Sequence, residues 1–284
     1  MNALTPFEEV MAARGKGMPA EGEVTITGND PVYSTKFKIG ETVAAVLAGV
    51  GTAVNDIHEL KTGERQKVSV DVRHAAATLR SGDYAQVQDA SGVYQPLIGP
   101  GHWSMIGITQ PWPTKDGRWV LPHFGLPHLQ ARMQKLLGCE ATPESVAKAV
   151  AQWDAMDLEA AIDEHRVCGG MVRTNAEWLA EEHGQVLAAK PIVEVIKIAD
   201  SDPEPMPAGA RPLSGIRALD LTRILAGPTC ARTLAEHGAD VLMVTAEGLP
   251  QLQHALVDTT YGKRSTYLDL KNADDNAVLK TLVQ

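Results

Sequence analysis

Cysteine is scarce in this 284-residue chain, and its placement argues against two kinds of site. Cys139, Cys168 and Cys230 lie far apart and form no C-x-x-C pair. Such spacing predicts neither a disulfide framework nor a zinc site, and it is typical of thiols in a reducing compartment. The nine histidines likewise include no pair at metal-ligand spacing on one clear helix face. No metal site is therefore predicted.

Two motifs of cofactor and hydrolase chemistry are also missing. The chain has no G-x-G-x-x-G turn, which disfavours a nicotinamide or flavin site. It has no G-x-S-x-G elbow, so a serine nucleophile on such a turn is not predicted. The formal net charge of −9 argues against nucleic acid or an anionic membrane as the main partner.

Long uncharged apolar segments are absent as well. The longest apolar-looking run, residues 39–60, contains Glu41, Asp56 and Glu59, which a lipid-embedded helix rarely tolerates. Glu8 and Glu9 stand where an export signal would need an apolar core. We therefore expect a cytoplasmic protein without a membrane partner. The composition, 44% hydrophobic and 21% charged, is that of an ordinary globular chain.

What the first third of the chain does contain is one strong helix and one strand. Apolar side chains recur at the helical period at Val43, Val46, Leu47, Val50, Val54 and Ile57. Alanines and glycines fill the other positions of 39–60, so we expect a core helix that neighbouring backbones approach closely. Residues 66–72 alternate apolar and polar side chains and predict a strand. Residues 1 to about 35 show no strong period and predict an irregular or partly ordered lead-in.

The middle of the chain predicts a separate, smaller α+β unit over residues 95–190. Asp116-Gly117 signals a β-hairpin, and helices are predicted at about 127–137 and from Pro143 onward. Thr174, with Glu177 three positions later, predicts a capping box. Residues 191–200 are expected to return to the main domain, with a strand at 192–198. Four prolines between 201 and 212 then predict an extended linker.

The last part of the chain, residues 213–284, predicts a strand–helix–strand unit. Residues 216–221 indicate a buried parallel strand, and a turn over 223–228 leads into a helix at 229–237. Gly238 ends that helix, and a second strand follows over 239–245. In parallel sheets of this kind the first turn lies where ligands bind.

These residues carry a resemblance to a known family. The run from Pro212 to Pro228, followed by Leu234-Ala235-Glu236-His237-Gly238-Ala239-Asp240-Val241, resembles the N-terminal opening of class III CoA-transferases. That family includes the relatives of carnitine and formyl-CoA transferases and the 2-methylacyl-CoA racemases. Gly262-Lys263-Arg264-Ser265, with Leu268-Asp269-Leu270-Lys271 after it, resembles the family's next element.

A second stretch resembles the same family in an unusual position. Gly40-Glu41, the Ala/Gly-rich helix after it and Lys61-Thr62-Gly63-Glu64-Arg65-Gln66 resemble a segment that ordinary members carry after the catalytic region. Here that segment comes first. We therefore interpret the chain as a rearranged or tandem-fused relative. Its end at Gln284, inside a helix without a cap, is interpreted as a truncation.

The resemblance implies a fold, a reaction and a partner. It implies an α/β protein with a Rossmann-like main domain, which begins over residues 1–94, and a smaller α+β domain. It implies CoA transfer between an acyl-CoA and a carboxylic acid through an aspartyl anhydride, with CoA as substrate and no permanently bound cofactor. The alternatives are a 2-methylacyl-CoA racemase-like enzyme and a catalytically inactive CoA-binding or scaffolding partner. A homodimer, possibly interlocked, is also implied.

The resemblance also implies which residues meet CoA. The turn Arg223, Ile224, Leu225 and Ala226 would lie against the adenine and ribose, and Lys263, with Arg264 beside it, would meet the phosphates. The catalytic residue stays unknown, because the family's aspartate is expected beyond the Lys-Arg-Ser strand. Asp83 is the one local substitute considered, and its position after the 66–72 strand argues against it. The isolated chain is therefore expected to bind CoA without completing turnover.

Overall fold

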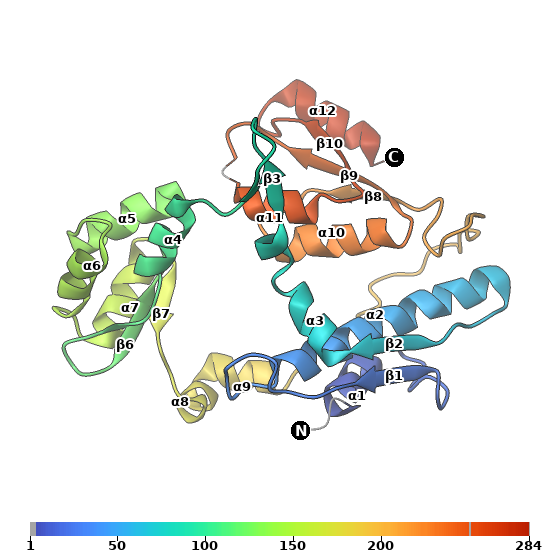
Figure 1. Ribbon diagram of the computed structural model, residues 1–284, viewed down its shortest axis with the longest axis horizontal. Helices are drawn as coiled ribbons and strands as arrows, with labels where there is room; N and C mark the ends of the chain where they lie inside the picture. The colour runs from blue at the N-terminus through green and yellow to red at the C-terminus, as the bar shows by residue number, and fades with distance from the viewer. Residues whose placement is uncertain (1–3, 250, 284) are drawn as a thin grey trace. The chain divides into compact units, whose positions relative to one another are not determined.

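The computed structural model describes residues 4–249 and 251–283, and these form two compact units (Figure 1). One unit combines residues up to 97 with residues from 190 onward, and the other comprises residues 98–189. The architecture is mixed α/β, with small parallel and antiparallel sheets. No helix in the described ranges is both long and apolar enough to cross a membrane.

The N-terminal part of the first unit is built around one long helix. Its elements are α1 (Leu4–Ala12), β1 (Val24–Thr27), α2 (Ile39–Thr62), β2 (Val68–Asp71), α3 (Val72–Thr78), the 3₁₀ helix η1 (Ser81–Tyr84), β3 (Gln86–Gln88) and β4 (Tyr94–Pro96). Strands β1 and β2 pair in parallel, with Val24 opposite Val68. The expected helix and strand are thus confirmed. The expected irregular or partly ordered lead-in contains two regular elements, α1 and β1, with irregular stretches between and after them.

The buried face of α2 differs from the predicted one. The large apolar residues were expected to face the core, yet Val46 is 46% exposed. The buried residues are small or polar: Gly40, Glu41, Ala44, Ala45, Ala48, Gly49, Thr52, Asn55 and Asp56. A Cβ on Gly49 would lie 2.5 Å from Val10 Cγ1, and one on Gly51 would lie 2.7 Å from Val68 Cγ1. The small residues therefore let α1 and β2 pack directly on the α2 backbone, which decides the buried face.

A cluster of ion pairs joins α2 to the segments before and after it. Asp56 accepts hydrogen bonds from Arg14 Nε at 2.7 Å and from Arg65 Nη1 at 2.9 Å. Arg65 also bonds Glu23 Oε1 at 2.5 Å and Glu59 Oε2 at 2.8 Å. The hydrogen bond from Arg14 outweighs the opposing effect of burial and, with that from Arg65, lowers the pKa of Asp56 to about 2.

This cluster predicts a loss of stability in acid. Because the folded-state pKa of Asp56 lies below its ordinary value of 3.8, its stabilisation is present above about pH 4. It is lost as the pH falls from about 4 to about 2, where Asp56 becomes protonated. Urea unfolding between pH 7 and pH 2 measures this. The Asp56→Asn variant is expected to show a flatter profile over that window, and a profile as steep as wild type would contradict the assignment.

The C-terminal part of the first unit is a three-stranded parallel sheet with helices. Its elements are β8 (Arg217–Asp220), α10 (Ala226–Glu236), β9 (Asp240–Thr245), α11 (Gln253–Thr259), β10 (Arg264–Tyr267) and α12 (Ala273–Leu282). The strand order is β10-β9-β8, and both pairings are parallel. The predicted strand–helix–strand unit is confirmed, although its helix begins at Ala226 rather than at 229. The sheet is separate from the β1–β2 pair within the described residues.

The second unit is a helical layer with a small antiparallel sheet. Its elements are α4 (Pro100–Ile108), β5 (Trp112–Pro113), β6 (Trp119–Pro122), α5 (Pro127–Leu137), α6 (Pro143–Val150), α7 (Ala155–Glu164), β7 (Gly169–Met171), α8 (Asn175–Ala180) and α9 (Glu182–Ala188). Phe124, Met133 and Leu158 lie fully inside its core. The hairpin at Asp116-Gly117 and the capping box of Thr174 with Glu177 are both confirmed.

The segment after this unit contradicts one prediction. Residues 192–198 form no strand in the structure, and Ile196 and Ile198 are 67% and 93% exposed. No strand among the described residues pairs with this alternating run, and the alternation by itself does not produce a strand. Residues 201–209 continue without regular structure, as the four prolines predict.

Candidate functional site

The turn between β8 and α10 has a strained backbone. It lies at the carboxyl end of β8, where Thr222 N donates to Asp220 Oδ1 at 3.0 Å. Ile224 has a φ of +74°, which a β-branched residue adopts only where the surrounding structure holds it. A Cβ on Gly227 would lie 2.4 Å from Thr222 Cβ, so α10 passes close to the turn. Leu225 is 57% exposed beside these constrained residues. Strained backbones cluster at active sites and ligand clamps, so this turn is a candidate binding element.

A buried ion pair holds this turn. Lys263 Nζ donates to Asp220 Oδ2 at 2.7 Å and to the carbonyl oxygen of Pro228 at 2.8 Å. The side chain of Lys263 is 1% exposed and that of Asp220 is 0% exposed. Burial raises the pKa of Asp220, but the hydrogen bonds from Lys263 and Thr222 outweigh it, and the net pKa is lowered. The pair therefore ties the end of β8, the start of α10 and the residue before β10 together.

This geometry changes what was expected of Lys263. The resemblance implies that Lys263 contacts a CoA phosphate. The alternative was a solvated cation at the start of a strand. In the structure it is neither exposed nor without a partner, because Asp220 compensates its charge. A lysine in this position has only part of its charge and hydrogen-bonding capacity left for a ligand.

A cavity of about 690 Å³ lies along β9 and β10, beside α11 and the loop after β9. The described residues that line it are Met243, Thr245, Ala246, Glu247, Leu249, Gln251, Leu256, Val257, Thr260, Lys263, Ser265 and Tyr267. Gln251 Nε2 donates to Thr245 Oγ1 at 3.1 Å, at the carboxyl end of β9. The cavity has polar and apolar walls and reaches the carboxyl ends of two parallel strands, which is where such sheets bind ligands.

The structure brings only some of the predicted site residues to this cavity. Lys263 lines it, whereas the turn Arg223–Ala226 is not among its lining residues. The Arg223 and Ile224 side chains are half-buried at the same edge of the sheet, at the end of the neighbouring strand. Arg264 is 73% exposed and pairs with Asp240, and both residues are at the amino ends of their strands. Arg264 therefore faces the opposite edge from the cavity mouth.

One buried carboxylate was missed by the sequence analysis. Glu41, in the first turn of α2, is 4% exposed. Its Oε1 accepts the N–H of Asp30 at 3.1 Å and lies 3.4 Å from Lys38 Nζ. Its Oε2 is buried and has no hydrogen-bond partner. A buried carboxylate oxygen without a partner is costly, so its presence calls for an explanation. The unusual acidic residue at the start of an apolar run was the signal available in the sequence.

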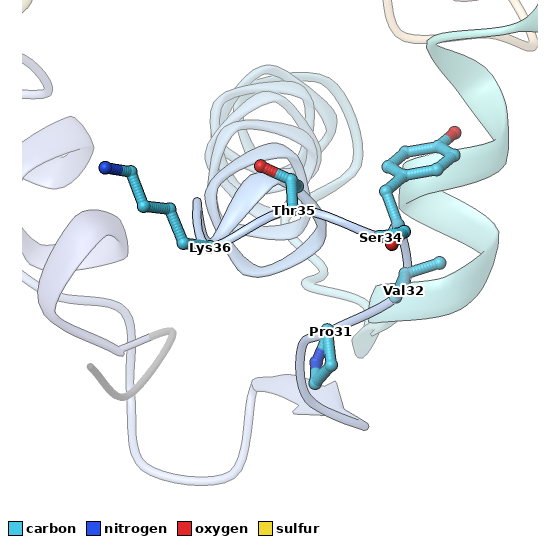
Figure 2. Close-up of a pocket in the computed structure, with 6 residues that line it drawn as sticks. Pro31, Val32, Ser34, Thr35 and Lys36 are labelled. Carbon is cyan, nitrogen blue, oxygen red and sulfur yellow. The ribbon is translucent and has the colours of Figure 1, made fainter.

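The loop before Glu41 has an open cavity of about 570 Å³, which is lined by Pro31, Val32, Tyr33, Ser34, Thr35 and Lys36 (Figure 2). Asp30, just before this loop, caps α2 by accepting the N–H groups of Gly40 at 3.2 Å and Glu41 at 2.8 Å. Tyr33 Oη donates to the carbonyl oxygen of Ala76 at 2.6 Å, which fixes the loop on α3. In Figure 2 the Lys36 side chain extends away from Val32 and Ser34.

The other carboxylate considered is already engaged. Asp83, on η1, accepts a hydrogen bond from Arg80 Nε at 2.6 Å. Its neighbour Ser81 donates to Asp258 Oδ2 on α11 at 2.9 Å. Asp83 therefore has a structural partner in Arg80, and it lines neither of the two cavities. Within the described ranges no group of three or more His, Cys, Asp and Glu side chains is arranged to hold a metal ion.

Comparison with known proteins identifies the family. The profile of CoA-transferase family III matches residues 7–210 and residues 213–284. The chain therefore belongs to CoA-transferase family III. The two matched ranges meet at residues 211–212, inside the predicted proline-rich linker.

Its relatives include several named transferases. It is 30% identical to the acetyl-coenzyme A transferase nodX of Hypoxylon pulicicidum, over 92% of this chain and 50% of that protein. It is 37% identical to a succinate–glutarate CoA-transferase of Agrobacterium fabrum over 28% of this chain and 24% of that protein. The chain thus spans half the length of nodX.

Solved structures are similar only in part. A hypothetical protein of Mycobacterium tuberculosis is 32% identical over 26% of this chain and 23% of its own, with a TM-score of 0.24. A CAIB/BAIF family protein of Brucella suis is 17% identical over 58% of this chain and 48% of its own, with a TM-score of 0.39.

Proposed function

We propose that this protein binds acyl-CoA and takes part in transferring CoA from it to a carboxylic acid. The observation that carries the proposal is the family match over residues 7–210 and 213–284. The names of two relatives, an acetyl-coenzyme A transferase and a succinate–glutarate CoA-transferase, agree with this class of reaction. A Rossmann-like main domain and a homodimer belong to the same proposal.

The nucleotide end of CoA is assigned to the carboxyl edge of the β8–β10 sheet. There the exposed turn at Leu225 offers an apolar surface for the adenine. The N–H groups at the start of α10 favour an anion. The 690 Å³ cavity beside it accepts the remainder of the nucleotide. In this proposal Lys263 has two roles. Its ion pair with Asp220 fixes the turn, and its side chain forms part of the cavity wall.

The carboxylate that the reaction needs is assigned to Glu41. A carboxylate attacks the thioester carbonyl carbon through oxygen, the C–S bond breaks, and CoA leaves as its thiolate. The CoA thiolate then attacks the glutamyl carbonyl of the mixed anhydride, the C–O bond breaks, and the original acid leaves. The acceptor carboxylate attacks the resulting glutamyl thioester and releases CoA thiolate, which attacks the acceptor carbonyl of the second anhydride and so forms the new acyl-CoA and frees the Glu41 carboxylate. Glu41 supports this role because its Oε2 has no partner, while Oε1 is already held by the Asp30 N–H. Because Glu41 is 4% exposed, the segments around it must move to expose Oε2 to a thioester.

A second candidate function is CoA binding without turnover. The observation in its favour is the 4% exposure of Glu41, which leaves no path for a thioester in this conformation. It differs from the first candidate only in the covalent step. Acylation of the protein therefore separates the two.

Calorimetry tests the part that both candidates share. We expect CoA and acetyl-CoA to bind the chain saturably and with similar affinities, because the assigned contacts are to the nucleotide rather than to the acyl group. A Leu225→Asp variant is expected to weaken binding by roughly tenfold or more, since it replaces the apolar surface assigned to the adenine with a negative charge that also opposes the anionic ligand. The matched control is Leu234→Asp, because Leu234 is on α10, the helix that follows Leu225, and is 36% exposed. Absence of binding by the wild type would overturn both candidates.

A further inference from the structure

The cavity beside β9 carries one uncompensated charge among its described lining residues, and that charge is negative. Twelve described residues line the cavity, and only Glu247 and Lys263 are charged. Lys263 donates to Asp220, whose side chain is 0% exposed, so their charges offset each other. Glu247 is exposed and lies two residues after Thr245, the last residue of β9. A ligand in the cavity therefore meets a carboxylate at its mouth.

The position of Glu247 indicates which group it would meet. It follows the second strand of a β–α–β unit, about 20 residues beyond the first turn. In nucleotide-binding units with this topology, an acidic side chain at that place accepts hydrogen bonds from ribose hydroxyls. A carboxylate has two oxygens and can accept from both hydroxyls of a vicinal diol. It repels a phosphate attached to the same ribose.

No cation that would offset Glu247 lines the cavity among the described residues. Arg264 pairs with Asp240 at the amino ends of β10 and β9, at the opposite edge of the sheet. Arg223 is on the β8–α10 turn and is not part of the cavity wall. The neighbouring polar groups of Thr245, Gln251 and Ser265 are neutral and suit hydroxyl groups as donors and acceptors.

We propose that Glu247 makes this cavity selective for a nucleotide whose ribose hydroxyls are both free, and that it disfavours a 3′-phosphate. The proposal rests on the proposed function, since it places the ribose and phosphates of CoA in this cavity. It predicts that dephospho-CoA, which lacks the 3′-phosphate of CoA, binds more tightly than CoA itself. CoA remains a ligand in this proposal, and the form without the 3′-phosphate is the one that binds more tightly.

Calorimetry with CoA and dephospho-CoA, at low and high salt, tests the proposal. We expect the wild type to bind dephospho-CoA roughly fivefold to tenfold more tightly at low salt. The difference is expected to shrink at high salt, because exposed charges are screened. The Glu247→Gln variant is expected to bind the two ligands about equally, and Glu247→Lys to prefer CoA. Glu64→Gln makes the same charge change at an exposed position outside the cavity and is expected to keep the wild-type preference.

The outcomes separate this proposal from the one on which it rests. If the wild type binds CoA as tightly as dephospho-CoA or more tightly, the assignment of Glu247 is wrong and the proposed function stands. If the preference exists but Glu247→Gln keeps it, the assignment of Glu247 is again wrong. If the wild type binds neither ligand, both this proposal and the proposed function are overturned.

Discussion

Replacing Lys263 with methionine is expected to lower the free energy of unfolding by about 3–5 kcal/mol. The substitution removes the cation and leaves the carboxylate of Asp220 buried, with a side chain that is 0% exposed. It also leaves the carbonyl oxygen of Pro228 without the donor at 2.8 Å. Methionine keeps most of the side-chain volume, so the loss reports the charge rather than a cavity. Urea unfolding monitored by circular dichroism measures it.

A double variant separates the ion pair from general disruption. Lys263→Met with Asp220→Asn removes both charges and is expected to recover part of the lost stability, because no charge is then buried alone. Arg264→Met is the matched control: that arginine is 73% exposed, and its pair with Asp240 should contribute no more than about 1 kcal/mol. A Lys263→Met variant as stable as Arg264→Met would show that the buried pair does not hold the turn.

Replacing Glu41 with glutamine is expected to abolish acylation of the protein by acetyl-CoA, a loss of roughly a thousandfold or more in rate. An amide cannot form the mixed anhydride, whereas its oxygen can still accept the N–H of Asp30. Intact-mass spectrometry of the wild type after incubation with acetyl-CoA should show an added acyl group, or CoA after the second step, that hydroxylamine removes. Peptide mapping should place the adduct on Glu41.

The controls for this experiment are within the same unit. Asp83→Asn is expected to keep the adduct, because Asp83 is paired with Arg80 and lines neither cavity. CoA binding by the Glu41→Gln variant should match the wild type, which shows that the protein is folded. If Glu41→Gln is labelled as fast as the wild type, the assigned carboxylate is wrong. If the wild type binds CoA and is never labelled, CoA binding without turnover is the better account.

Much of the local structure was predictable from the sequence because it depends on near neighbours. The prolines and glycines around residues 223–238, together with two apolar runs, predict the strand–helix–strand order that the structure shows. Thr174 and Glu177 cap α8 through contacts three residues apart. The family was also predictable, since motifs such as Gly262-Lys263-Arg264-Ser265 are contiguous in the chain. In each case the determining residues lie within a few positions of each other.

The roles of the site residues needed the tertiary structure. Lys263 is a buried partner of Asp220 rather than a surface cation because the two residues, 43 positions apart in the sequence, are in contact. Glu41 carries an oxygen without a partner only because the segment before α2 folds over it, with the backbone of Asp30 against Oε1. The buried face of α2 is the one on which α1 and β2 approach its glycines closely, and the periodic valines do not determine it.

The chain by itself thus determined the order of strands and helices around residues 213–284, the caps and turns that depend on near neighbours, and the family to which the protein belongs. Only the tertiary structure decided which charges are compensated, which face of a helix is buried and which carboxylate is left to react. The physical reason is one of range. Turns, caps and periodic patterns act over a few residues, whereas burial and ion pairing depend on segments brought together from distant parts of the chain. The failed strand at 192–198 makes the same point, because alternation forms a strand only where a partner strand exists.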